Sequence, residues 1–66
     1  MAVARKSKAD KELDKLTERT YYKHGDGVQI NVMDIGNIYR DFRVSVLAGT
    51  DPDAAMIAII SKYRLN

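Results

Sequence analysis

The stretch VQINVM, residues 28–33, decides between the folds open to this chain. β-Branched apolar residues alternate with polar ones through Val32, and the side chains of a strand point alternately to its two faces. The preceding stretch KHGDG, residues 23–27, contains two glycines around an aspartate and is typical of a turn. The pattern therefore predicts a strand with one buried face and a free face carrying Gln29 and Asn31.

Residues 34–49 follow this strand and fit two structures. As a helix, they place their apolar residues in one stripe, with Asp34 as the N-cap and Gly49 just past the C-terminal end. As a strand, residues 42–46 (FRVSV) alternate and would form a hairpin with residues 28–33. The helical stripe accounts for more positions and is preferred. The alternative is a small α-β-β-α domain.

A third element begins at the segment TDPD, residues 50–53, which combines a helix cap, a first-turn proline and acidic residues. The helix that follows, residues 54–63, is apolar on all sides, with Met56, Ile57, Ile59 and Ile60 taken to point in four directions. A chain of 66 residues without cysteine and with one histidine has neither disulfides nor a zinc site to stabilise it. Burial of this helix by a partner chain is therefore expected.

The N-terminal part of the chain is basic. The first 24 residues contain seven Lys or Arg and four Asp or Glu, whereas the remaining 42 contain four and five. Residues 7–22 have leucines at helical spacing and Ser7 as a potential cap, which predicts a helix. The expected organisation is a basic arm with a helix in residues 1–27 and a dimerisation domain in residues 28–66.

The order of basic arm, alternating strand, helix ending at Gly49 and apolar helix resembles the ribbon-helix-helix family of DNA-binding repressors (the Arc, MetJ and CopG type). The resemblance covers roughly residues 28–63. It implies a mainly α protein with one short strand per chain, in which two chains pair their strands and lay this ribbon in the major groove of DNA.

The resemblance also implies a role for individual residues. The base-reading residues would be Gln29, Asn31 and Met33, since Gln and Asn amides match the edge of adenine. The phosphate-contacting residues would be Arg5, Lys6, Lys8 and Thr50. The core of the homodimer would contain Ile30, Val32, Ile38, Phe42, Met56, Ile57, Ile59 and Ile60. The expected function is sequence-specific binding of double-stranded DNA by a cytoplasmic repressor, autoregulator or plasmid-partition protein, with the arm available to a protein partner.

Other classes of function have less support. The sequence has no recognisable nucleophile with a base, no phosphate-binding loop and no metal-ligand cluster, so neither an enzyme nor a cofactor is expected. The longest apolar run, residues 54–60, is far shorter than the ~20 residues of a membrane span. Aromatic residues followed by a basic one, such as Tyr22, suggest base stacking on single strands, but most are better explained as core. The alternative function is a small protein-interaction module, including a phage structural protein or an inhibitor.

Overall fold

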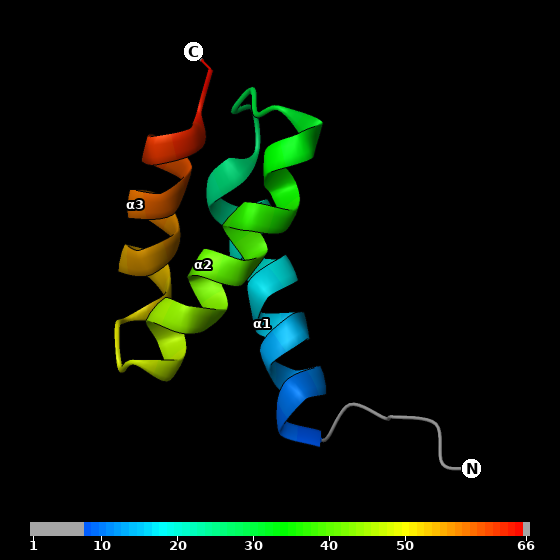
Figure 1. Cartoon of the computed structure of the whole chain (residues 1–66), viewed down its shortest axis with the longest axis vertical. Helices are drawn as coiled ribbons and strands as arrows, with labels where there is room; N and C mark the ends of the chain where they lie inside the picture. Colours follow the sequence, from blue (N-terminus) through cyan, green and yellow to red (C-terminus); the bar gives the residue numbers. More distant parts are fainter. Residues whose placement is uncertain (1–7, 66) are drawn as a thin grey trace, which may run out of the picture.

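The computed structural model describes residues 8–65, which form three α-helices joined by short connections (Figure 1). Helix α1 spans Lys8–Gly25, α2 spans Ile35–Leu47 and α3 spans Pro52–Tyr63, and a short 3₁₀ helix, η1, spans Val32–Asp34. The chain runs up α1, down α2 and up α3, and α2 crosses the front of the domain in the view of Figure 1. The described part of the chain is therefore a small helical domain.

The predicted strand at residues 28–33 is wrong. Among the described residues, the pairing in this region is one isolated antiparallel bridge between Ile30 and Arg64, next to a 2.8 Å hydrogen bond from the Leu65 N–H to the Gln29 carbonyl. The Asn31 side chain accepts a hydrogen bond from the Met33 N–H at 2.9 Å and thereby caps η1. A short polar side chain that bonds to the backbone two residues ahead favours a turn over a strand, and here it ends the extended segment.

The predicted ribbon-helix-helix architecture is therefore also wrong, because its ribbon requires a strand from each chain with continuous backbone hydrogen bonds between the two. The α-β-β-α alternative is also wrong, since residues 42–46 lie inside α2. The preferred helical interpretation of this segment is confirmed. Gly49 follows the helix with a φ of 99°, and the hydrogen bonds from Gly49 to Val46 and from Thr50 to Ser45 close a Schellman motif.

Helix α3 begins as its sequence predicts. Asp51 is the N-cap and accepts a hydrogen bond from the Ala54 N–H at 3.1 Å, and Pro52 is the first helical residue. The apolar residues of α3 are buried within one chain, however. Its larger apolar residues share a single face except Ile57, which has 51% of its surface exposed, and Ala54 and Ala58 are exposed as well. The core contains Ile38 and Phe42 from α2 and Ala55, Met56, Ile59 and Ile60 from α3.

Helix α1 closes the remaining side of this core. Leu16 and Tyr21 pack against it, and two threonines of α1, Thr17 and Thr20, are also buried. Their hydroxyls donate to the carbonyls four residues earlier, at 2.7 Å and 2.6 Å. The buried hydroxyls are thereby satisfied within the helix, so α1 can cover the core with few large apolar side chains.

Polar contacts tie each outer helix to α2 at the border of the core. The Arg43 Nη1 donates to the Asp14 carboxylate at 2.9 Å, and its Nη2 lies 3.8 Å from Asp10, which joins α2 to α1. The Tyr63 hydroxyl donates to the Asp41 carboxylate at 2.9 Å, which joins α3 to α2. This hydrogen bond raises the pKa of Tyr63 above its ordinary value.

Candidate functional site

The outward face of α1 carries a line of basic side chains. They are spaced three or four residues apart, and all are exposed: Lys8, Lys11, Lys15 and Arg19, called here the basic row. At 3.6 residues per turn the row occupies an arc of about 80° on the side opposite the buried threonines, and it is about 16 Å long. Among the described residues, no carboxylate lies within ion-pair distance of these four cations. Their charge is therefore available to an external anion.

The acidic residues of α1 lie to the side of the basic row. Asp10 and Asp14 face α2 and contact Arg43. Glu12 and Glu18 are exposed and flank the row. Because residues 8–65 contain nine basic and nine acidic residues, the domain is electrically balanced as a whole. The basic row is a result of local segregation of charge.

An exposed aromatic ring continues the basic row at its C-terminal end. Tyr22 lies three residues after Arg19, within the same arc of α1, and 65% of its surface is exposed. Its ring meets Tyr21 edge to face at 6.1 Å, and Tyr21 meets Tyr39 in the same way at 5.7 Å. A shallow hollow of about 320 Å³ adjoins the ring and is lined by Lys15, Glu18, Arg19 and Tyr22. The end of the row is thus an open surface with both a flat ring and cations.

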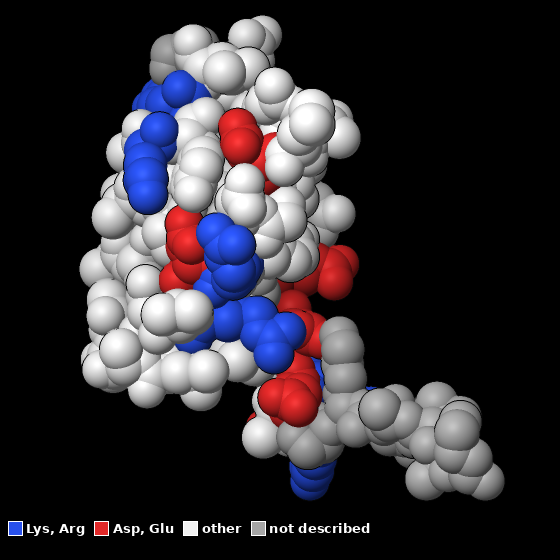
Figure 2. Space-filling view, viewed as in Figure 1, with Lys and Arg blue, Asp and Glu red and all other residues white. Residues whose placement is uncertain are grey.

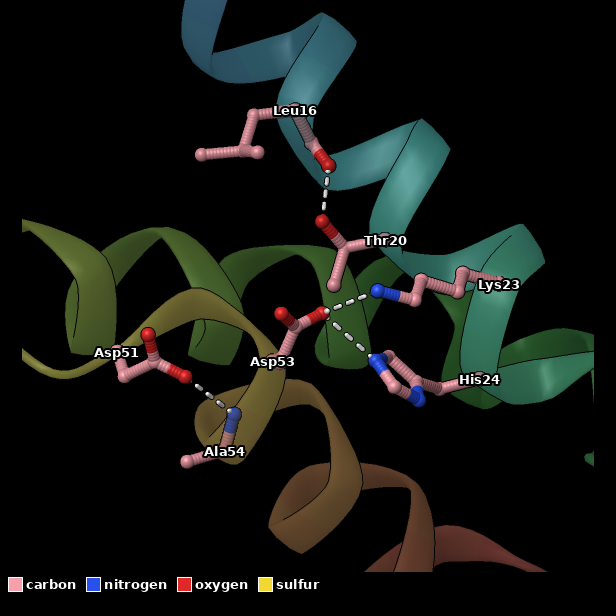
Figure 3. Close-up of polar contacts among 7 residues, drawn as sticks. All are labelled: Leu16, Thr20, Lys23, His24, Asp51, Asp53 and Ala54. Atoms are coloured by element: carbon pink, nitrogen blue, oxygen red, sulfur yellow. Dashed lines mark hydrogen bonds and ion pairs between the residues drawn. The ribbon is translucent and has the colours of Figure 1, made fainter.

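A second polar cluster joins the end of α1 to the start of α3 (Figure 3). One oxygen of the Asp53 carboxylate lies 2.8 Å from the His24 Nε2 and 3.4 Å from the Lys23 Nζ, and in Figure 3 both side chains reach it from the last turns of α1. The hydrogen bond from His24, with a smaller effect of the Lys23 charge, lowers the pKa of Asp53 below its ordinary value of 3.8. This cluster is a contact between helices α1 and α3, and it pairs the Lys23 cation with a carboxylate.

The His24 contact gives a test by pH. Because the pKa of Asp53 is lowered in the folded state, its contribution to stability is present above the unfolded pKa and is lost as the pH falls through the folded pKa, below about 3.8. The substitution His24→Leu should raise the pKa of Asp53 and remove the larger part of this contribution, and the smaller effect of Lys23 remains. His24→Gln, which keeps a donor, should retain part of the effect. Carboxyl ¹³C shifts recorded against pH measure it, and equal Asp53 pKa values in wild type and His24→Leu would contradict the assignment.

The predicted base-reading residues lie in the connection after α1 and in η1, and not on a strand. Gln29 is exposed, and its backbone carbonyl accepts the Leu65 N–H. The oxygen of the Asn31 side-chain amide is engaged in capping η1. Met33 is 84% exposed in η1. Without a ribbon, nothing aligns these three side chains in the manner that major-groove reading requires.

The four residues predicted to contact phosphates lie in different parts of the chain. Arg5 and Lys6 lie outside the described residues. Lys8 is the first residue of α1 and belongs to the basic row, together with three residues that the sequence analysis did not single out. Thr50 is exposed in the turn before α3, where the Asp51 carboxylate already occupies the helix N-terminus. Plotting the charged residues of α1 on a helical wheel would have revealed the row.

The predicted dimer core is for the most part the core of a single chain. Five of its members are buried within the described domain: Ile38, Phe42, Met56, Ile59 and Ile60. Ile30 is partly buried against them, and Ile57 is half exposed. Val32 is 79% exposed, contrary to its expected position on a buried strand face. Burial of α3 therefore does not require a partner chain.

The outward face of η1 and α2 carries exposed apolar side chains. Val44 and Leu47 are exposed three residues apart on α2, Arg40 lies one turn before Val44, and Met33 is exposed in η1 just before the helix. A groove of about 390 Å³ runs along one side of Val44, with Gly36 and Tyr39 in its lining. In Figure 2 the surface where α2 passes into α3 is white, whereas the surface over α1 is a mixture of red and blue. We call the surface formed by Met33, Val44 and Leu47 the α2 apolar face.

The chain matches no protein-family model, no curated protein and no solved structure with which it was compared. Residues 8–65 hold no group of three or more acidic or histidine side chains arranged to bind a metal ion. In the same range, none of the helices combines the length and the apolar character needed to cross a membrane. Two surfaces remain from which a function can be argued. One is the basic row with the adjacent Tyr22 ring, and the other is the α2 apolar face.

Proposed function

We propose that this protein binds nucleic acid through the outward face of α1, with the basic row contacting the sugar-phosphate backbone. The observation that carries the proposal is that four exposed cations share one face and have no carboxylate partner within residues 8–65. Lysine and arginine side chains supply most protein contacts to phosphates, and a basic stripe on one helix face is typical of such contacts.

Backbone binding by α1 differs from the base reading that the resemblance to ribbon-helix-helix repressors implied. Backbone contacts fix the position of a protein on nucleic acid but carry no sequence information directly. We therefore propose an electrostatic binder whose affinity depends on the number of phosphates contacted. In the sequence, Arg5 and Lys6 precede the row and would add two further cations.

The salt dependence of binding tests the proposal. If four cations each displace a counterion, log K should fall with log[salt] with a slope of about −3 to −4. Fluorescence anisotropy with a labelled oligonucleotide at several salt concentrations measures this slope. Lys15→Gln should reduce its magnitude by about one, whereas Lys62→Gln on α3, the matched control, should leave it unchanged. A slope near zero, or equal effects of the two variants, would overturn the proposal.

A second candidate function, self-association, is favoured by the α2 apolar face. If two copies of the face pair antiparallel about Arg40, Met33 lies opposite Leu47 and Gly36 lies opposite Val44, so each apolar residue meets another or a glycine. A Cβ built at Gly36 meets no atom within 4 Å, which leaves room for a valine from the partner. Such a two-fold interface is isologous, because the same patch is used on both chains.

This candidate makes an unusual demand on Arg40. Its guanidinium would lie beside its own copy at the two-fold axis, so Arg40→Leu should strengthen association. Leu47→Asp should weaken it, because a carboxylate would be placed in the contact. Sedimentation equilibrium over concentrations up to about 1 mM, the weak end of specific affinities, measures both effects. Monomer at every concentration for wild type and Arg40→Leu would rule the interface out.

A further inference from the structure

We infer that Tyr22 is a base-stacking platform and that the preferred ligand of the α1 face is single-stranded nucleic acid. The inference rests on the proposed function and specifies the ligand of the same site. The bases of a single strand are accessible and stack on aromatic rings, whereas the bases of a duplex are already stacked on each other. A ring beside a backbone contact is therefore informative about strandedness.

The position of Tyr22 fits this role. It lies in the same arc of α1 as the basic row, and the whole site from Lys8 to Tyr22 is about 21 Å long. A strand whose phosphates follow the row would present a base to the ring at its end. The hollow of about 320 Å³ beside Tyr22 is also lined by Lys15, Glu18 and Arg19. The ring that would take a base therefore lies next to two cations that can hold a phosphate, with one carboxylate in the same lining.

The ring is supported on its inner side. Tyr21 meets it at an interplanar angle of 63° and in turn meets Tyr39 at 62°. Tyr21 and Tyr39 pack against the hydrophobic core, so the row of three rings connects Tyr22 to the rigid part of the domain. Most aromatic residues of this chain are part of that core or pack against it, but Tyr22 keeps 65% of its surface exposed. This exposure has no evident role in folding.

The experiment compares four labelled probes of about 12 units, a length within the range of single-strand sites: oligo-dT, oligo-rU, an abasic strand of the same charge and a duplex. Wild type should bind the two base-carrying strands more tightly than the abasic strand. Tyr22→Leu should weaken binding to these strands by roughly 5- to 100-fold, the usual range for the loss of one stack. It should leave the abasic strand and the duplex within twofold of wild type.

Tyr22→Phe is the matched control, because it keeps the ring and removes only the hydroxyl. It should bind all four probes as wild type does. A loss on either base-carrying strand supports the inference, and its relative size ranks DNA against RNA. Equal losses on all probes, or no loss with Tyr22→Leu, would overturn the stacking role while leaving the backbone contact intact. Failure of wild type to bind any probe would instead overturn the proposed function and this inference with it.

Discussion

Phe42→Ala is expected to lower the free energy of unfolding by about 3–5 kcal/mol. The Phe42 side chain has no exposed surface and lies at the centre of the core with Ile38 and Met56. Its truncation removes the largest fully buried side chain of the described domain and leaves a cavity that three short helices cannot close. A domain of this size has only a few kcal/mol of net stability. The variant should therefore be largely unfolded at 25 °C.

Circular dichroism during urea denaturation measures this effect. Two variants separate the loss of packing from other causes. Phe42→Leu keeps most of the buried volume and should be much less destabilised. Val44→Ala, on the exposed side of the same helix, should change stability by no more than about 0.5 kcal/mol. A Phe42→Ala protein with the wild-type denaturation midpoint would be inconsistent with the core described above.

The second large effect concerns binding. The triple variant Lys11→Glu, Lys15→Glu, Arg19→Glu should lose at least about 100-fold in affinity for any oligonucleotide at low salt, because three phosphate contacts are replaced by repulsive charges. The loss should shrink as salt is added, since exposed charges are screened. Anisotropy titrations at two salt concentrations measure both.

Reversing three charges also affects α1 itself. Like charges four residues apart destabilise a helix by a few tenths of a kcal/mol per pair. The neutral triple variant with glutamine at the same positions avoids this and should still lose most of the affinity. Lys62→Glu, a single reversal on α3, should bind as wild type does. If it weakens binding as much as Lys15→Glu, the interaction depends on net charge and the row has no special role.

The ends of α2 and α3 were predictable because they depend on capping residues that are adjacent in the sequence. Asp51 with Pro52 specifies a helix start, and Gly49 specifies a helix end, regardless of what the helices pack against. The strand was mispredicted because VQINVM alternates like a strand but contains Asn31, whose side chain caps the 3₁₀ helix. Whether an alternating segment forms a strand depends on the neighbouring strands with which it can pair, and the alternation itself does not specify them.

The candidate site divides in the same way. The basic row requires only the periodicity of α1 and could have been predicted from the positions of Lys11, Lys15 and Arg19. Its lack of carboxylate partners could not, because periodicity also places Glu12 and Glu18 beside the row, and only the structure shows that neither forms an ion pair with it. The expectation that α3 needs a partner chain was wrong because the packing of the other helices could not be foreseen from the sequence. The arc of apolar residues on α3 was judged too wide for one chain, but α1 and α2 cover most of it.

The polar contacts at the core border have a consequence for the uniqueness of the packed state. Arg43 with Asp14 joins α1 to α2, Tyr63 with Asp41 joins α2 to α3, and His24 with Asp53 joins α1 to α3. Apolar packing alone would tolerate small rotations of each cylinder about its own axis. One side-chain hydrogen bond for each pair of helices removes that freedom, because rotation of a helix would leave a donor or a carboxylate without its partner. The His24 contact is exposed and the other two are partly buried, so each adds little to the free energy of unfolding. Their larger effect is to select a single rotational setting of the helices.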